Sequence, residues 1–292
     1  MRYAAIDIGS NAVKCMVGTV IENDFPVVIK EMYARVPVRL GTDVFQSGSV
    51  SADSEKKLLD SLQAFTLLMK SWHVSGGVIA ATSAMRDAAN GQDILRHIEE
   101  QTNLKTWIIK GKVEAALITE LFAGLGKKEL QKIMIDLGGG STEVTFANPD
   151  GKRKSKSFQI GAVRSLLHEA SKVELRKMLD FIEDNIDPFG QLIIASGGNI
   201  NALKSHFGLA EPMYLSFQEL QRAYDQLHPL SVSERVERFL IHPDRADVIV
   251  PAAEVFLKIM KFANAQKLMV PKAGLADALI LMQHQGRTPV EY

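Results

Sequence analysis

One short pattern occurs twice in the chain, and this internal repeat constrains the fold more than any other feature. Residues 6–11 read IDIGSN and residues 135–140 read IDLGGG. In each copy an apolar strand ends in a glycine turn, and a second strand-like segment follows, at 12–20 and at 142–147. Because glycine lets a backbone turn tightly, each copy predicts a hairpin. We expect two similarly built domains, each with one such turn at a shared cleft that holds a phosphate chain.

Strand-like and helix-like segments alternate along the chain, which favours an α/β fold. A third strand is predicted after each hairpin, at 25–32 and at 153–160. We expect a first domain over residues 1–125 and a second over 126–274. A C-terminal helix at about 275–292 is expected to pack back on the first domain.

The composition is that of an ordinary globular protein. Of 292 residues, 46% are hydrophobic and 23% are charged, which excludes collagen-like and disordered classes. The 34 basic and 34 acidic side chains balance, so neither nucleic acid nor a membrane is an expected partner. The single cysteine, Cys15, excludes a disulfide framework and a cysteine-rich zinc site. The N-terminal segment lacks the pattern of a signal peptide, and we expect a cytoplasmic location.

The glycine turns are suited to binding an anion. Converging backbone N–H groups form a concavity that holds phosphate without a net positive charge, and short polar side chains at the same edge add donors. A third glycine turn follows the apolar strand predicted at 191–195. The repetition favours phosphate binding over a plain structural hairpin, which explains a single copy equally well. The candidate phosphate-binding residues are Gly9, Ser10, Asn11, Gly138, Gly139, Gly140, Ser141, Thr142, Ser196, Gly197 and Gly198.

An aspartate precedes each of the two repeated turns. A carboxylate is poorly suited to touching phosphate directly, but it can order Mg²⁺ through the water shell of the ion. Asp7 and Asp136 are therefore candidate metal-binding residues.

Several sequence blocks occur together in a fixed order. The most informative are AIDIGSN at 5–11, ATSAMRDA at 81–88 and DLGGGSTE at 136–143, and further blocks are VRLG at 38–41, GKVEA at 111–115, RADVIVP at 245–251 and AGL at 273–275. Taken together, they resemble the exopolyphosphatase/guanosine pentaphosphate phosphohydrolase (Ppx/GppA) family. The order and spacing of the blocks, over nearly the whole chain, are more specific than any one of them.

This resemblance implies a fold, a reaction and a set of site residues. The fold is the actin-like fold of sugar kinases, heat-shock chaperones and actin, with two ribonuclease-H-like domains around a cleft. Members of the family use Mg²⁺ to remove terminal phosphate from inorganic polyphosphate, from guanosine pentaphosphate, or from both. The matching catalytic residues are Glu114, which activates a water, the counter-charge Arg86 and the acid Glu143. Glu143 joins Asp136 as a candidate metal residue.

Three positions depart from the family pattern. Val113 stands where the family usually has the first of two adjacent glutamates, Lys14 where arginine or histidine is common, and Asn199 where threonine is usual. These changes bear on the choice of substrate more than on the reaction. Long members of the family carry an additional helical domain, and this chain resembles the short, two-domain type.

Exopolyphosphatase activity is the main prediction, and other functions are alternatives. Guanosine pentaphosphate is the second candidate substrate. An ATP-dependent small-molecule kinase shares the expected fold, and a non-catalytic regulator that binds polyphosphate or the alarmone is a further alternative. Basic residues at 152–156 predict a solvated hairpin edge, with guidance of a polyphosphate chain as the minority interpretation. A homodimer is a hypothesis drawn from the habit of actin-like proteins to pair.

Overall fold

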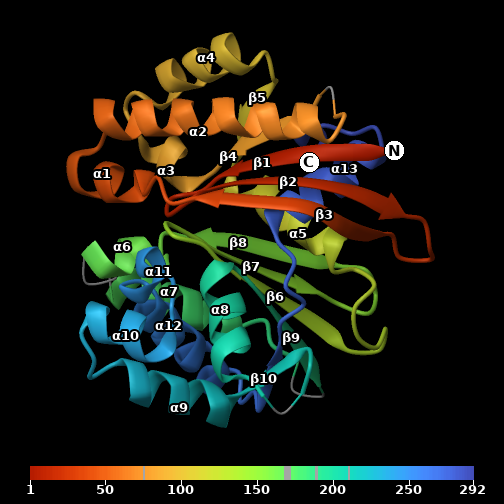
Figure 1. Ribbon diagram of the computed structural model, residues 1–292. Helices are drawn as coiled ribbons and strands as arrows, with labels where there is room; N and C mark the ends of the chain where they lie inside the picture. Colours follow the sequence, from red (N-terminus) through yellow and green to blue (C-terminus); the bar gives the residue numbers. More distant parts are fainter. Residues whose placement is uncertain (75, 168–171, 188–189, 210) are drawn as a thin grey trace. The chain divides into compact units, whose positions relative to one another are not determined.

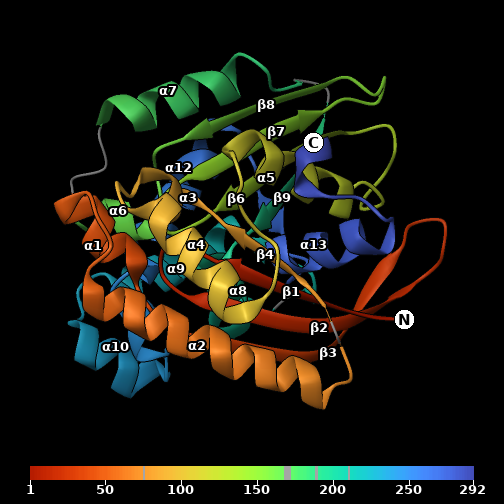
Figure 2. The ribbon, with the colours of Figure 1, turned by 90° about the horizontal axis from the view of Figure 1, so that it is seen from above.

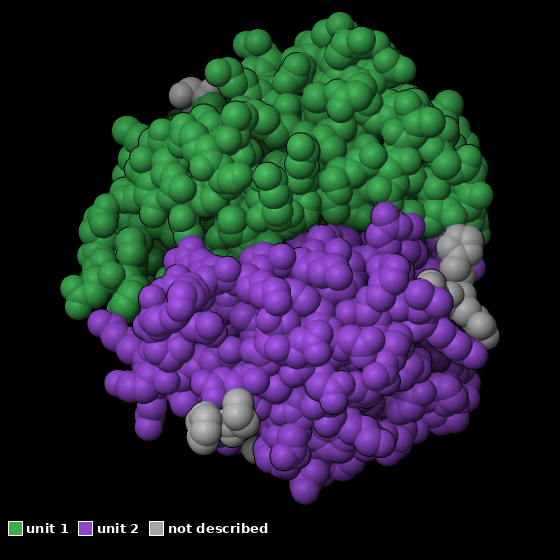
Figure 3. Space-filling model, turned by 180° about the vertical axis from the view of Figure 1, so that it is seen from behind, with its two compact units in different colours: residues 1–125, 274–292 green, residues 126–273 purple. Residues whose placement is uncertain are grey.

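The computed structural model describes residues 1–74, 76–167, 172–187, 190–209 and 211–292. The chain forms two compact units, which Figure 3 shows in different colours. Unit 1 contains residues 1–125 and 274–292, and unit 2 contains residues 126–273. Each unit has its own sheet and its own helices (Figure 1).

Unit 1 is built on a mixed sheet of order β3-β2-β1-β4-β5. The first three strands form an antiparallel meander, and the last two run parallel to β1. The hairpin predicted from the first glycine turn is therefore confirmed. The third strand extends beyond its predicted segment because the long β2 offers it partners as far as Val13, which pairs with Val36. The strands are β1 (Arg2–Ile8), β2 (Val13–Ile21), β3 (Val27–Val36), β4 (Val78–Ala81) and β5 (Thr106–Ile108).

Helices cover both faces of this sheet (Figures 1 and 2). α2 and α4 pack together on one face, and α5 and α13 pack together on the other. The apolar side chains of α13 and α5 form a core with β1 and β2, in which Ala5, Met16, Leu117 and Ile280 are buried. The helices of unit 1 are α1 (Leu40–Ser47), α2 (Ala52–Ser71), α3 (Ser83–Asp87), α4 (Gly91–Thr102), α5 (Gly111–Leu121) and α13 (Leu275–His284), followed by the short 3-10 helix η1 (Pro289–Glu291).

Helix α13 begins where the chain re-enters unit 1. Its first turn carries Asp277, which accepts a hydrogen bond from the Gly274 backbone N–H at 2.9 Å and forms an ion pair with Lys30 of β3 at 3.1 Å. Burial raises the pKa of Asp277, and the Lys30 ammonium opposes that shift. A buried carboxylate needs such partners, so these contacts anchor the start of α13.

Unit 2 repeats the plan of unit 1. Its sheet has the order β10-β11-β9-β6-β7-β8, in which β6, β7 and β8 form the antiparallel meander and β9 and β11 continue it in parallel. The second predicted hairpin is therefore confirmed as well. The additional strand β10 pairs antiparallel with β11. The strands are β6 (Gln131–Leu137), β7 (Thr142–Ala147), β8 (Arg153–Phe158), β9 (Gln191–Ser196), β10 (Tyr214–Ser216) and β11 (Lys267–Met269).

Most helices of unit 2 pack around the buried α12, and α10 packs against α11. α12 contacts α6, α7, α8 and α9, while α7 also contacts β8 and α8 contacts β6 and β9. These helices are α6 (Ala162–Leu167), α7 (Lys172–Glu183), α8 (Gly198–Phe207), α9 (Phe217–Leu227), α10 (Val232–Phe239), α11 (Pro243–Ala246) and α12 (Ile249–Phe262). Within the described residues, no helix is both long enough and apolar enough to cross a lipid bilayer.

Three of the basic residues predicted at a hairpin edge, Arg153, Lys154 and Lys156, lie on β8, which is the edge strand of the second sheet. Lys154 and Lys156 are exposed, and their ammonium groups lie 5.4 Å and 5.7 Å from the ring centre of Phe181 on α7. Lysines on an edge strand discourage pairing with another chain, and cations over an aromatic ring are attracted to it. The two lysines are therefore explained by their position on an exposed edge strand. Guidance of a polyphosphate chain stays a prediction.

The buried thiol of Cys15 predicts a loss of stability at alkaline pH. Its side chain is fully buried in β2, and burial raises its pKa from 9.0 to about 12. A raised folded-state pKa stabilises the fold below about pH 9, and that contribution is lost as the pH rises toward 12. From pH 8 to pH 10.5 we expect the unfolding free energy of the wild type to fall by about 2 kcal/mol more than that of Cys15→Ala. Urea titrations of both proteins measure this difference, and parallel pH dependences would contradict it.

Candidate functional site

The first glycine turn joins β1 to β2 and is backed by the start of α1. Gly9 donates its N–H to the Ala12 carbonyl at 3.2 Å, and a Cβ on Gly9 would lie 3.1 Å from that oxygen. The Ser10 carbonyl accepts a hydrogen bond from Gly41 at 2.7 Å, and the Asn11 carbonyl accepts one from Arg39 at 3.0 Å. In a planar trans peptide the carbonyl and the next N–H point in opposite directions. The N–H groups of Asn11 and Ala12 therefore point away from α1.

The second glycine turn joins β6 to β7 and is backed by α6 in the same way. Gly138 donates to the Ser141 carbonyl at 3.0 Å, and its own carbonyl accepts a hydrogen bond from Ala162 at 3.0 Å. The Gly139 carbonyl accepts hydrogen bonds from the backbone N–H groups of Val163 and Arg164, and the Gly140 carbonyl accepts one from Arg164 Nε at 2.8 Å. With three carbonyls directed at α6, the N–H groups of residues 139–141 point to the opposite side. That side can hold an anion through the main chain.

A glycine behind each turn makes this close backing feasible. A Cβ on Gly41 would lie 2.9 Å from Ser10 Cβ, and a Cβ on Gly161 would lie 2.4 Å from the Gly139 carbonyl carbon. In the sequence, Gly41 lies in a family block without an assigned role, and Gly161 and Arg164 lie outside every block. A glycine-containing turn after the third strand of each copy was the signal that could have found them.

The third turn, at residues 196–198, lies beside the second because β9 pairs with β6. Gly197 has a φ of 120°, and a Cβ there would lie 2.3 Å from the Leu137 carbonyl oxygen, so this position requires glycine. Ser196 Oγ donates to the Ala273 carbonyl at 3.1 Å, and the Gly198 carbonyl accepts a hydrogen bond from Arg245 Nη1 at 2.6 Å. The Ala273 carbonyl and the Arg245 guanidinium thus hold the third turn from two sides. Arg245 lies in a family block to which the sequence assigns no role.

The short polar side chains of the turns differ in what they contact. Thr142 is fully buried, and its hydroxyl donates to the Ile160 carbonyl. Ser10 and Ser141 are also buried, at 3% and 5% exposure, and Asn11 is half-buried. The hydroxyls of Thr142 and Ser196 therefore bind backbone carbonyls of neighbouring segments and stabilise the two turns.

Arg86 and Glu114 meet in unit 1. β4 lies next to β1, and the Thr82 N–H donates to the Ile8 carbonyl at 3.1 Å, so α3 begins beside the end of β1. On α3, Arg86 Nη1 donates to the Ile109 carbonyl at 2.8 Å and lies 3.4 Å from Glu114 Oε2. Glu114 occupies the first turn of α5 and is 7% exposed. A buried acid and a guanidinium therefore lie together at the carboxyl ends of the parallel strands, where α/β sheets usually bind ligands.

Val113 and Glu114 are neighbours in the sequence, but their side chains lie in different environments. Val113 is buried in the core that α5 and α13 form with β1 and β2, whereas Glu114 is turned toward Arg86. Val113, one of the three departures from the family pattern, is therefore an apolar core residue in this chain.

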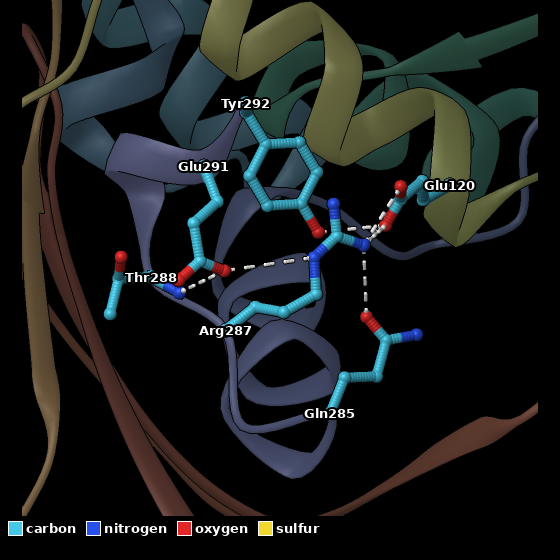
Figure 4. Close-up of polar contacts among 6 residues, drawn as sticks. All are labelled: Glu120, Gln285, Arg287, Thr288, Glu291 and Tyr292. Atoms are coloured by element: carbon cyan, nitrogen blue, oxygen red, sulfur yellow. Dashed lines mark hydrogen bonds and ion pairs between the residues drawn. The ribbon is translucent and has the colours of Figure 1, made fainter.

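The C-terminal segment anchors the other end of α5 (Figure 4). Arg287 Nη1 lies 3.1 Å from both carboxylate oxygens of Glu120, and the Tyr292 hydroxyl donates to Glu120 at 2.7 Å. The Arg287 guanidinium also lies over the Tyr292 ring, 4.2 Å from its centre. Burial, followed by the hydrogen bond to Glu120, raises the pKa of Tyr292. These contacts tie the C-terminal segment to the end of α5 that lies away from Glu114.

The two aspartates predicted to hold metal have different cross-strand partners. In unit 1, Asp7 is paired with Lys14 on β2, whose Nζ lies 2.6 Å from Asp7 Oδ2. In unit 2, Asp136 is paired with Glu143 on β7, and the two carboxylates are 7% and 2% exposed. Two like charges at neighbouring cross-strand positions repel each other.

Two buried carboxylates side by side match the oxygen donors that Mg²⁺ prefers. The donor set of Asp136 and Glu143 therefore fits a divalent cation, which would relieve the repulsion between them. Asp7, by contrast, already has the Lys14 ammonium against it. The repeated motif by itself does not distinguish the two aspartates, because the partner of each lies outside the motif, on the next strand.

A family model identifies the chain. Residues 21–285 match the model of the Ppx/GppA phosphatase family. The chain belongs to the Ppx/GppA phosphatase family. This confirms the family resemblance that the sequence blocks predicted.

Individual relatives of this Ppx/GppA chain are distant. It is 23% identical to exopolyphosphatase 1 of Mycobacterium tuberculosis, over 96% of this chain and 88% of the relative. It is also 23% identical to a bifunctional 3-dehydroquinate synthase/phosphatase of Fusobacterium nucleatum, over 91% of this chain but only 44% of that protein. The chain therefore spans less than half the length of the bifunctional relative.

A solved structure shows the same fold. The crystal structure of an exopolyphosphatase from Cytophaga hutchinsonii superimposes with a TM-score of 0.81, covering 99% of each chain at 20% identity. The predicted α/β, actin-like fold is confirmed, and each unit has a mixed sheet.

Proposed function

We propose that this member of the Ppx/GppA family hydrolyses the terminal phosphoanhydride bond of inorganic polyphosphate and releases orthophosphate. The observation that carries the proposal is the pair of backed glycine turns, each of which directs main-chain N–H groups away from its supporting helix. Such turns bind phosphate groups through the backbone. The similarity to proteins named exopolyphosphatase supports polyphosphate as the substrate. Guanosine pentaphosphate, which gives the family the second half of its name, is the second candidate.

Phosphoryl transfer to water depends mainly on positioning and on charge neutralisation. The turns at residues 9–11, 138–141 and 196–198 hold the phosphate oxygens, and the glycines bring the backbone close to them. We assign this binding to the main chain, because the hydroxyls of Thr142 and Ser196 donate to backbone carbonyls. Arg86 supplies a counter-charge to the phosphate chain.

Glu114 acts as the general base in this proposal. Its carboxylate orients the attacking water and accepts a proton from it, and Arg86 keeps the side chain in one orientation. A positioned general base typically contributes about 10²- to 10⁴-fold to the rate. The carboxyl group of Glu114 then holds the proton until it passes to solvent.

Asp136 and Glu143 are the residues that we propose to hold Mg²⁺. The ion supplies charge neutralisation for the phosphate oxygens when it is bound. Asp7 is less suited to this role in the structure, because its carboxylate is paired with Lys14. We therefore restrict the direct metal ligands to unit 2.

The experiment is a turnover assay with four phosphate donors, which are long-chain polyphosphate, short-chain polyphosphate, guanosine pentaphosphate and ATP. We expect orthophosphate release from long-chain and short-chain polyphosphate, loss of release with a chelator, and recovery with Mg²⁺. Hydrolysis of guanosine pentaphosphate alone would correct the substrate. Tight binding of polyphosphate without turnover would favour a regulator, and phosphate transfer from ATP to an acceptor would favour a kinase. Light scattering tests the predicted homodimer against the monomer mass of 32.2 kDa.

A further inference from the structure

We infer that Ser157 positions Glu143 for binding of the divalent cation. This inference rests on the proposed metal site at Asp136 and Glu143. Ser157 lies directly opposite Glu143 on the neighbouring strand β8, and its Oγ donates a hydrogen bond to Glu143 Oε1 at 2.7 Å. No role for Ser157 follows from the sequence blocks, because it lies outside all of them.

The hydrogen bond acts on a carboxylate that is removed from water. Glu143 is 2% exposed, whereas Ser157 lies on the exposed edge strand. A glutamate has three rotatable side-chain bonds, and a short hydrogen bond to one carboxylate oxygen holds it in a single orientation. The same contact fixes the direction in which the second oxygen points. Contacts of this kind to metal ligands change metal affinity by about 10- to 100-fold.

Comparison with unit 1 shows what a different residue at this position does. The strand registers place Asp7, Lys14 and Arg35 side by side in unit 1, as they place Asp136, Glu143 and Ser157 in unit 2. The first set carries a net positive charge and the second a net negative charge. A neutral hydroxyl at position 157 orients Glu143 without cancelling its charge, whereas a guanidinium would cancel it.

Ser155 offers a matched control on the same strand. It lies two residues before Ser157, so both side chains are on the same face of the sheet. Its Oγ accepts a hydrogen bond from Thr145 Oγ1 at 2.9 Å and is therefore engaged away from the two carboxylates. Both serines are exposed, so replacement by alanine removes the same atoms from similar surroundings.

The test is Mn²⁺ binding, measured by electron paramagnetic resonance on the full chain without substrate. We expect Ser157→Ala to weaken Mn²⁺ binding by about 10-fold or more, Ser157→Thr to retain the wild-type affinity, and Ser155→Ala to leave it unchanged. Ser157→Arg, which copies Arg35 of unit 1, should abolish binding. Circular dichroism melts establish that each variant is folded.

The outcomes separate this inference from the proposed function. Wild-type affinity in Ser157→Ala, together with weakened binding in Asp136→Asn, would overturn the role of Ser157 and leave the metal site standing. An equal loss in Ser155→Ala would assign the effect to the strand and would also overturn the role of Ser157. Mn²⁺ binding that is insensitive to Asp136→Asn would remove both the proposed metal site and the inference built on it.

Discussion

Replacing Glu114 by glutamine should lower the rate of orthophosphate release by about 10²- to 10⁴-fold. Glutamine has nearly the same shape and keeps an oxygen that can face Arg86, but its amide does not accept a proton from water. Glu114 is 7% exposed and lies on the first turn of α5. The measurement is steady-state release of phosphate from polyphosphate at saturating Mg²⁺, with a filter-binding assay for retained polyphosphate affinity.

Glu120→Gln is the control for this change, because it alters a glutamate on the same helix. Glu120 contacts Arg287 and Tyr292 at the far end of α5, so the variant should lose some stability and keep its turnover (Figure 4). Wild-type rates in Glu114→Gln would remove Glu114 from the role of general base. Equal losses in both variants would point to helix α5 as a whole and not to the chemistry of one carboxylate.

Replacing Gly161 by alanine should lower kcat/KM for polyphosphate by about 100-fold, because a displacement of about 1 Å in a positioning element has that effect. The new Cβ would lie 2.4 Å from the carbonyl carbon and oxygen of Gly139 and from the N atom of Gly140. All three are backbone atoms, so the turn itself must move. Steady-state kinetics measure the loss, and we expect the KM for polyphosphate to rise because the main-chain donors shift.

Gly151→Ala controls for strain that does not reach the turn. Gly151 has a φ of 84° in the loop before β8, and a Cβ at this position would have no atom within 4 Å apart from those of its chain neighbours. Alanine at such a φ costs about 1 kcal/mol of stability, which allows a comparison between two destabilised proteins. Unchanged kcat/KM in Gly161→Ala would show that residues 138–141 do not hold the phosphate.

The repeated motif predicted the local structure of both units correctly. An apolar strand, a glycine turn and a second strand depend on neighbours in the sequence, so β1 with β2 and β6 with β7 were predictable from IDIGSN and IDLGGG. The family blocks likewise indicated the fold, since their order is a property of the sequence. The third strands were predicted too, although β3 continues to Val36 because its pairing with β2 extends that far.

Only the tertiary structure decided what stands next to each motif. In the repeated motif Asp7 and Asp136 are equivalent, but the strand register places Lys14 beside the first and Glu143 beside the second. Gly161 looks like any turn glycine until the backbone of Gly139 is found against it. Charge repulsion and steric contact depend on distances of a few ångströms between strands and loops, and those distances are set by pairing and packing. The sequence alone therefore determined the hairpins and the family, and the folded chain determined which carboxylates can share a cation.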